Sequence, residues 1–269
     1  MKGRDLVVLK TGLIPKSIQI GNIDIRWYAI IIVSAMILAL LICKKYNGRY
    51  GIKFDTILDF SLFVIPISII CARIYFVLFS FDLYKDNLWE VFKINNGGLA
   101  IYGGIIGGLI VIAILCKIKK VKLLDLTDYI APVIALAQSI GRWGNYINVE
   151  AYGYETDSFI KMEVVENGYV KYVHPTFLYE SVCTFIIFCI LSYFARKRKF
   201  SGQITYMYII LYSFIRFFIE GLRTDSLMLG NFRISQILSL ILLVVFSIIM
   251  AYKIFNCFMS KSVDEKCEK

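Results

Sequence analysis

The sequence predicts an all-α polytopic membrane protein with about seven transmembrane helices and a small extracytoplasmic head that contains a β-hairpin. The composition, the spacing of apolar runs and the placement of basic residues all support this class. Hydrophobic residues make up 58% of the 269 residues and charged residues 19%, whereas soluble domains average about 45–50% apolar residues. Mean hydropathy is +0.69. We therefore expect one transmembrane domain over residues 1–269.

Seven apolar runs have the length that a transmembrane helix needs, about 17–25 residues for a hydrocarbon core of about 30 Å. The fourth run is the weakest, because it is short and contains Asp128, Pro132 and Gln138. No cleavable signal peptide is expected, since residues 1–26 are mixed and polar. The runs cover roughly 27–43, 57–79, 98–117, 126–141, 176–195, 203–220 and 234–255.

Basic residues predict the orientation of these spans. The connections at 44–53, 117–122 and 196–199 and the C-terminal tail hold sixteen Lys and Arg residues, against seven in the opposing loops. The N-terminal tail does not follow this asymmetry, because it carries five basic residues of its own. Because basic loops stay in the cytoplasm, we expect an outside N-terminus and a cytoplasmic C-terminus. The formal charge of +10 then lies at the membrane surface, and no nucleic-acid partner is expected.

The longest connection, 142–175, lies between the fourth and fifth spans and is expected to form an extracytoplasmic head. Its middle reads KMEVVE-NG-YVKYV. Asn-Gly between two β-prone runs predicts a tight hairpin. With one histidine, His174, and no CxxC pair among seven cysteines, no metal site is expected.

The sixth span carries a polar stripe on an otherwise apolar helix. Tyr212, Arg216, Glu220 and Arg223 are spaced 4, 4 and 3 residues apart, which places them on one helix face. A charge inside a membrane helix is costly unless it is paired or solvated. Two interpretations remain open: a structural Arg–Glu–Arg clamp, or an anion site in which Glu220 orients guanidinium groups toward a phosphate.

A second polar cluster follows the fourth span and reads GRWGNYINVEAYG at 141–153. Its mixture of Arg142, Asn145, Asn148 and Glu150 with glycines predicts a ligand-holding loop at the outer boundary. Tyr179 and Glu180 open the fifth span at the same level. His174 is expected to be structural. Arg73 in the second span is either a snorkelling residue or a further member of the anion site.

The third span opens with GGLAIYGGIIGG, in which Gly103, Gly104, Gly107 and Gly108 form a small-residue surface. Such a surface favours close packing of a neighbouring helix. Tyr102 lies just inside the outer boundary. It is either an interfacial aromatic anchor or a hydroxyl available to a site.

Residues 141–153 resemble the GRxGNFxNxExxG signature of the prolipoprotein diacylglyceryl transferase family at every fixed position but one, Tyr146 for Phe. Four more segments are similar to that family in the same order: Arg26-Trp27-Tyr28, GGLAIYGG, HPTFLYE and Tyr212…Arg216…Glu220…Arg223. Together they span about residues 20–255. One departure is that many members have His where Tyr102 stands, so a histidine base is not expected there.

The resemblance implies an enzyme of the bacterial cell membrane with its active site toward the outer face. It would transfer the diacylglyceryl group of phosphatidylglycerol to the lipobox cysteine of a prolipoprotein signal peptide. A thioether forms, glycerol phosphate leaves, and no cofactor is implied. The implied catalytic residues are Arg142, Arg216, Tyr102 and Glu150. The implied substrate-binding residues are Arg142, Tyr28, Asn145, Asn148, Gly153, Tyr212, Glu220 and Arg223.

Displacement at a carbon that bears a phosphate ester needs cations to stabilise the leaving group, which suits Arg142 and Arg216. A thiol with a pKa near 8.5 needs a base or a positive field, and Glu150 and Tyr102 both remain candidates. The alternative function is a multi-pass transporter of an anionic solute that uses the same arginines. An odd number of spans and the absence of an internal repeat in the sequence count against transport.

Overall fold

The computed structural model describes residues 7–21, 23–85, 87–93, 97–230 and 232–267. Within these residues, seven helices are long and apolar enough to cross a membrane, which confirms the predicted helical, polytopic fold, while the extracytoplasmic placement of the head stays a prediction. Lys2, Arg4 and Lys269, which entered the charge comparison, lie outside the described residues. The seven helices are α1 (Trp27–Lys45), α2 (Phe54–Phe79), α3 (Ile101–Ile118), α4 (Leu123–Asn148), α5 (Thr176–Phe194), α6 (Gln203–Leu222) and α7 (Ile234–Cys267).

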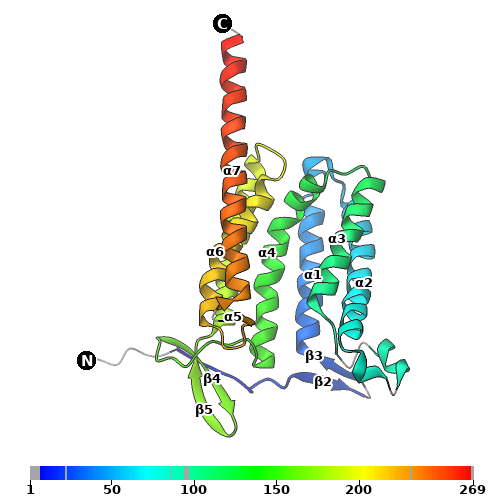
Figure 1. Ribbon diagram of the computed structural model, residues 1–269, viewed down its shortest axis with the longest axis vertical. Helices are drawn as coiled ribbons and strands as arrows, with labels where there is room; N and C mark the ends of the chain where they lie inside the picture. Colours follow the sequence, from blue (N-terminus) through cyan, green and yellow to red (C-terminus); the bar gives the residue numbers. More distant parts are fainter. Residues whose placement is uncertain (1–6, 22, 86, 94–96, 231, 268–269) are drawn as a thin grey trace, which may run out of the picture. The chain divides into compact units, whose positions relative to one another are not determined.

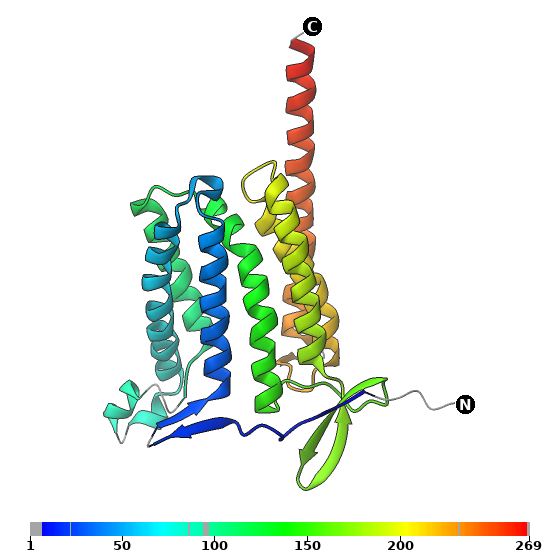
Figure 2. The same ribbon diagram turned by 180° about the vertical axis from the view of Figure 1, so that it is seen from behind.

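The chain forms two compact units, one from residues 1–42 and 127–269 and the other from residues 43–126. In the first unit, α4, α5, α6 and α7 run side by side, and the head lies at the end where α4 stops and α5 begins (Figure 1). The basic α5–α6 connection lies at the opposite end of the same bundle (Figures 1 and 2). The first unit therefore separates its polar head from its basic connection by the length of its helices.

The head is built on the predicted hairpin. Strand β4 (Ile160–Glu166) pairs antiparallel with β5 (Tyr169–Val173). Asn167 and Gly168 turn between them with φ of 52° and 81°, the positive values that a two-residue hairpin turn requires. Met162, Val164 and Val173 are buried against Phe177 at the start of α5, so the hairpin packs its alternating apolar face on the bundle.

Three strand pairings were not predicted from the sequence. Strand β1 (Val7–Lys10) joins β4 in parallel and completes a three-stranded sheet of order β1-β4-β5. Strands β2 (Ser17–Ile20) and β3 (Ile23–Arg26) form a second hairpin that leads directly into α1. Short β6 (Met228–Leu229) and β7 (Phe232–Arg233) precede α7.

Helix α4 extends well beyond the predicted fourth span. It runs through Pro132 and ends only at Asn148, so the expectation of a loop over 141–153 is wrong for the first part of that segment. Asp128 is fully buried and accepts hydrogen bonds from Gly202 N at 2.7 Å and Thr205 N at 2.8 Å. These donors belong to the first turn of α6, whose amides have no partner within the helix. The carboxylate of α4 therefore caps α6, which makes a charge tolerable in this span.

The second unit shows that the glycines of α3 serve helix packing. A Cβ built on Gly103 would lie 2.5 Å from the Cys71 carbonyl oxygen, and one on Gly107 would lie 2.5 Å from the Cys71 side chain. Only glycine lets the two helices approach this closely. Asp59 of α2 pairs with Lys119 after α3, with Nζ 2.5 Å from Oδ2.

Arg73 of α2 is buried and holds the segment that precedes α3. Its guanidinium donates five hydrogen bonds to backbone carbonyls of the same unit, at 2.6 to 3.4 Å. Since a guanidinium has five N–H donors, this set accounts for its capacity. The structure therefore gives Arg73 a loop-holding role and not a place in an anion site. The acceptors are the carbonyls of Glu90, Val91, Lys93, Gly97 and Gly98.

The orientation predicted from basic residues is testable at the hairpin tip. In intact cells, we expect Asn167→Cys to react with a membrane-impermeant maleimide and Lys119→Cys to be protected until the membrane is opened. Labelling is read by gel shift after each treatment. The reverse pattern, with Lys119→Cys labelled and Asn167→Cys protected, would invert the topology.

Candidate active site

The buried carboxylate of Glu180, on the second turn of α5, is the centre of the site. Its side chain is only 3% exposed. One oxygen, Oε1, accepts a hydrogen bond from Arg142 Nη2 and another from the Tyr212 hydroxyl at 3.2 Å. The other, Oε2, accepts from Arg216 Nη1 at 3.1 Å. Glu180 thus connects α4, α5 and α6 through one carboxylate.

Two serines bring α4 and α5 close enough for this contact. Ser139 Oγ donates to the Ser181 carbonyl at 2.8 Å, and Ser181 Oγ donates to the Ser139 carbonyl at the same distance. Trp143 Nε1 adds a hydrogen bond to Ser181 Oγ at 3.2 Å. Arg142 lies three residues after Ser139, and Glu180 lies one residue before Ser181. The reciprocal serine pair therefore sets the register in which Arg142 meets Glu180.

Tyr212 and Arg216 of the polar stripe of α6 contact this carboxylate, a partner that the spacing alone did not predict. Arg216 binds Glu180 and also pairs with Glu220, with Nη2 2.5 Å from Oε2. Tyr212 stacks on Tyr208 with ring centroids 5.8 Å apart, and the Tyr208 hydroxyl donates to Gln138 Oε1 at 2.9 Å. The stripe is thus paired with protein along its length and is no exposed charge in the bilayer.

A second hydrogen-bond chain leads from Arg142 to the end of α4. Arg142 Nη1 donates to Asn145 Oδ1 at 3.4 Å, and Asn145 Nδ2 donates to Glu150 Oε1 at 2.9 Å. Asn148 Nδ2 reaches the same oxygen at 3.2 Å. Glu150 is exposed. The structure therefore brings together Arg142, Asn145, Asn148 and Glu150, but as the last turns of a helix and the residues after it.

Exposure decides which charges of the cluster a ligand would meet. The carboxylates of Glu180 and Glu220 are each 3% exposed, whereas the side chains of Arg142 and Arg216 are 23% and 16% exposed. The acids lie behind the guanidinium groups. An approaching anion would therefore contact the arginines first, even though the four groups carry no net charge together.

Two predicted substrate-binding residues, Arg223 and Gly153, have other contacts in the structure. The Arg223 side chain forms a bidentate ion pair with Asp225, at 2.9 and 2.8 Å, and the Arg223 backbone N donates to the Glu220 carbonyl at 3.2 Å. This pair holds the pKa of Asp225 below its usual value. Gly153 is buried where the head crosses α6, and a Cβ there would lie 2.9 Å from the Leu222 carbonyl oxygen. Gly153 N donates to the His174 carbonyl at 2.9 Å.

Glu220 is also held from the head side. Arg233 Nη1 donates to the Glu220 carbonyl, and Arg233 Nη2 donates to the Tyr154 hydroxyl at 2.7 Å. His174 contacts Tyr179, with Nδ1 3.3 Å from the hydroxyl, which agrees with a structural role. These contacts tie the C-terminal end of α6 to the head.

Tyr28 and Tyr102, the two tyrosines expected at the site, belong to different units. Tyr28 packs its ring on α4, where a Cβ on Gly144 would lie 2.4 Å from Tyr28 Cδ2. Gly144 is thus the residue of the 141–153 segment that lets Tyr28 approach. Tyr102 is the second residue of α3 in the second unit and is 56% exposed.

Glu180 is the functional candidate that the sequence analysis did not select. The fifth-span segment HPTFLYE contained it, and its position beside Tyr179 gave it no pattern of its own. Helix spacing predicts partners within one helix, but the Glu180 contacts come from two other helices. Tyr146, the departure from the family signature, also has a specific contact: its hydroxyl donates to the Lys10 carbonyl at 2.6 Å.

The fold and the cluster define a polytopic membrane protein with a buried carboxylate between two partly exposed arginines. A family profile described as prolipoprotein diacylglyceryl transferase matches residues 15–252. The chain belongs to the prolipoprotein diacylglyceryl transferase family.

Relatives that carry the name phosphatidylglycerol–prolipoprotein diacylglyceryl transferase are similar over most of their length. The protein of Listeria innocua is 46% identical over 240 residues, which cover 86% of each chain. That of Finegoldia magna is 48% identical and covers 84% of this chain and 90% of its own. That of Clostridioides difficile is 49% identical and covers 82% and 87%.

The shared use of Glu180 predicts unequal effects of two isosteric substitutions. Glu180→Gln removes the common counter-charge of Arg142 and Arg216, whereas Glu220→Gln leaves Arg216 paired with Glu180. Removing one partner of a buried ion pair costs about 3–5 kcal/mol. We expect Glu180→Gln to lower the melting temperature in detergent clearly more than Glu220→Gln. Equal shifts in thermal unfolding would contradict the central position of Glu180.

Proposed function

We propose that this protein transfers the diacylglyceryl group of phosphatidylglycerol to the lipobox cysteine thiol of prolipoproteins. The observation that carries the proposal is the Arg142–Glu180–Arg216 cluster, which presents two guanidinium groups over a buried carboxylate within the family-matched region. The proposed site is the outer face of the bacterial cell membrane, with the N-terminus outside and the C-terminus in the cytoplasm. Transport of an anionic solute gains no support from the family match.

The reaction exchanges one bond at a glycerol carbon of the lipid. The cysteine sulfur forms a C–S bond at the carbon that bears the phosphate ester, and the C–O bond breaks. Glycerol phosphate leaves with the bonding electrons, and the thiol proton passes to a base. Negative charge grows on the leaving phosphate, so fixed cations beside it lower the barrier.

Arg142 and Arg216 are the proposed cations. Each guanidinium is planar and carries five donors, so the hydrogen bonds to Glu180 leave others for a phosphate oxygen. Glu180 holds both arginines from behind and fixes the direction in which their remaining donors point. We assign Glu180 as the positioning residue of the pair, with Tyr212 and Glu220 supporting it through Oε1 and Arg216.

The contacts of the proposed binding residues suit some of them to direct contact with the lipid and others to an indirect role. Asn145 and Asn148 extend the network from Arg142 to Glu150, which suits them to the glycerol hydroxyls of the head group. Tyr28 lies against the same helix at Gly144. The contacts of Gly153 and Arg223 favour an indirect role: both hold the head against the end of α6.

The direct test uses purified protein, labelled phosphatidylglycerol and a synthetic peptide with a lipobox cysteine. We expect mass spectrometry to show a diacylglyceryl adduct on the cysteine and release of glycerol phosphate. A matched peptide with Ser in place of that cysteine is the control and should stay unmodified. An unmodified lipobox peptide, together with solute uptake into liposomes, would favour the transport alternative.

The planar guanidinium group of each arginine, which presents donors on two arms, should be essential to turnover. Arg142→Lys and Arg216→Lys each keep the charge but lose the second donor arm. We expect kcat/KM per folded molecule to fall tenfold or more, about 1.4 kcal/mol of transition-state stabilisation. Arg198→Lys is the matched control, because it alters another buried ion pair, to Asp128 at 3.3 Å. Near wild-type activity in both site variants would remove the arginines from the mechanism.

Two substitutions can show whether Glu150 or Tyr102 is the general base. Glu150→Gln keeps an oxygen that accepts from Asn145 and Asn148 but cannot take a proton, and Tyr102→Phe removes a hydroxyl. A general base contributes about 10²–10⁴-fold to the rate. We expect one variant to lose activity in this range and to lose the corresponding limb of the pH–rate profile. If both retain their activity and pH profile, neither residue is the base.

A further inference from the structure

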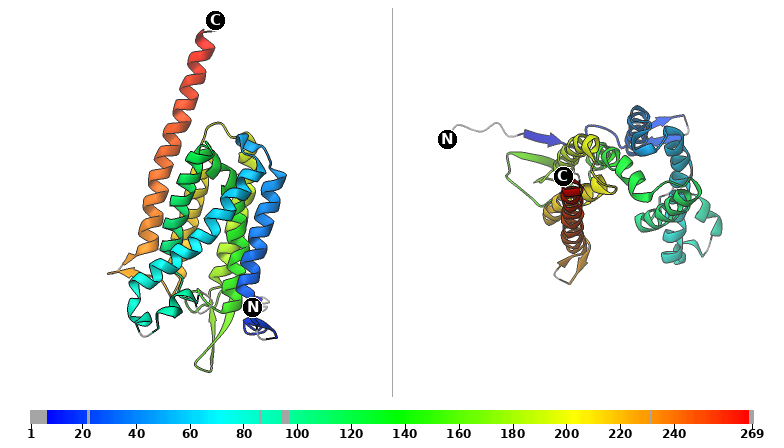
Figure 3. Two further views of the ribbon diagram at one scale, coloured as in Figure 1. Left: turned by 90° about the vertical axis from the view of Figure 1, so that its right-hand side faces the viewer. Right: turned by 90° about the horizontal axis from the view of Figure 1, so that it is seen from above.

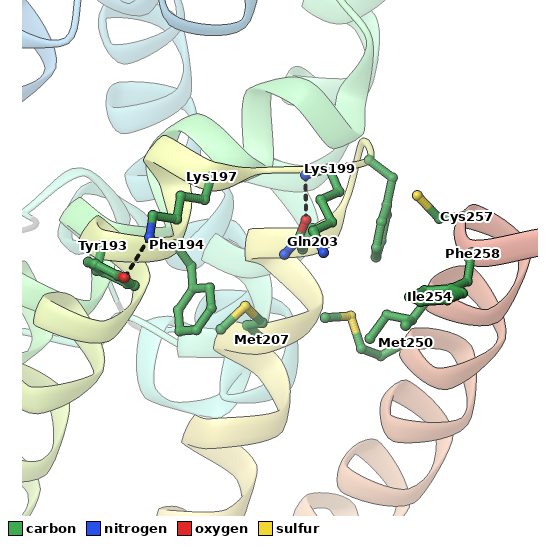
Figure 4. A pocket seen from close by; sticks show the side chains of 11 residues that line it. Tyr193, Phe194, Lys197, Lys199, Gln203, Met207, Met250, Ile254, Cys257 and Phe258 are labelled. Carbon is green, nitrogen blue, oxygen red and sulfur yellow. Dashed lines mark hydrogen bonds between the residues drawn. The ribbon is translucent and has the colours of Figure 1, made fainter. Parts of the chain in front are cut away.

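A groove of about 590 Å³ lies at the end of the first unit opposite the head. It is formed by the end of α5, the α5–α6 connection, the first turns of α6 and one face of α7 (Figure 4). A volume of this size is typical of small-molecule sites. Its lining residues lie in one compact unit and have no role in the Glu180 cluster.

The walls of the groove are apolar. Met250, Ile254, Cys257 and Phe258 follow one another at helical spacing along α7 and face Met207 of α6 (Figure 4). About one turn from Met250 the two helices are in contact, with the rings of Tyr206 and Phe246 5.7 Å apart. Helix α7 continues past the α5–α6 connection (Figure 3). The groove therefore lies next to a contact between α6 and α7, and its α7 wall is apolar from Met250 to Phe258.

The rim is basic. Lys197 and Lys199 line the groove, and Lys197 Nζ is oriented by a hydrogen bond to the Tyr193 hydroxyl at 2.7 Å. That bond uses one of three ammonium donors. Lys199 N donates to Gln203 Oε1 at 2.7 Å, which fixes the connection on α6. The sequence has no Asp or Glu in 193–203 or 250–259, so no acid from these lining segments neutralises the lysines.

We propose that this groove binds an anionic diacyl phospholipid of the adjacent leaflet. One acyl chain would lie along the α7 face, and the phosphate would contact Lys197 and Lys199 at the level where α5 ends. Basic pockets between transmembrane helices bind anionic head groups in this way. Under the predicted orientation, the leaflet is the cytoplasmic one.

The groove is distinct from the proposed active site. Lys197 follows Glu180 by seventeen residues along α5 and the turn after it, a rise of about 25 Å at 1.5 Å per residue. The inference goes beyond the proposed transfer reaction and does not depend on it. It assigns the site to lipid binding alone, with no chemical step.

The test uses native mass spectrometry of the full chain in detergent, titrated with dioleoyl phosphatidic acid or with dioleoyl phosphatidylcholine. Phosphatidic acid is the probe because it shares the phosphate but lacks the glycerol head group of the proposed substrate. We expect tighter binding of phosphatidic acid. The double variant Lys197→Gln/Lys199→Gln should weaken the groove-bound adduct roughly twenty-five-fold, since each lysine contributes about fivefold.

The matched charge control is Lys44→Gln/Lys45→Gln, which removes two exposed lysines at the end of α1. This control should bind phosphatidic acid as the wild type does. A second pair of variants tests the apolar wall: Met250→Trp fills the groove, whereas Ile248→Trp adds the same ring to an exposed face of α7. Only Met250→Trp should displace the lipid.

Equal affinity for the two lipids, or wild-type binding in the double lysine variant, would overturn the proposal. So would unchanged binding in Met250→Trp. Transfer activity is measured in parallel on the same variants and should persist in Lys197→Gln/Lys199→Gln. If the wild-type protein binds the lipid but shows no transfer activity, the proposed function is contradicted and the groove assignment is not.

Discussion

The Glu180 carboxylate lies between two arginines from different helices, and the arrangement of α4, α5 and α6 depends on keeping it paired. A buried carboxylate without counter-charges costs several kcal/mol, so the three helices cannot separate at this level without exposing it or leaving it unpaired. The serine pair of α4 and α5 and the tyrosines of α6 then hold the same register. The structure therefore contains a clamp of ion pairs between helices, and the proposed anion site would use the exposed side of the same arginines.

At the other end of the bundle, Asp128 is a second buried carboxylate, and its partners are of a different kind. Glu180 is neutralised by guanidinium groups, whereas Asp128 accepts from the amides and hydroxyl at the start of α6 and pairs with Arg198. Both carboxylates are nearly inaccessible. Helix α6 is thus fixed at its first turn by α4 and near its last turns by α5, which leaves little freedom for the stripe that carries Arg216.

Sequence patterns predicted the elements whose signals are local. Seven apolar runs, the Asn167-Gly168 turn and the stripe from Tyr212 to Glu220 all depend on residues within one element, and the structure confirms them. The extent of α4 was underestimated, because Asp128 and Pro132 look unfavourable until the first turn of α6 is known to satisfy the carboxylate. Glu180 and the role of Arg73 depend on residues from other elements, so periodicity could not reveal them. The parallel strand β1 was missed for the same reason.

The pairing of β1 with β4 joins Val7 to Ile160 and Lys10 to Glu163, and the Tyr146 hydroxyl holds the same strand at Lys10. About one hundred and fifty residues and four spans separate these partners. Contacts at such separation form late, because the loop must close before they stabilise anything. During synthesis, β1 leaves the ribosome before α1 to α4 and has no pairing partner until β4 has been made. The sheet of the head therefore joins a strand that precedes α1 to two strands that follow α4, so it is complete only after these four helices have been made.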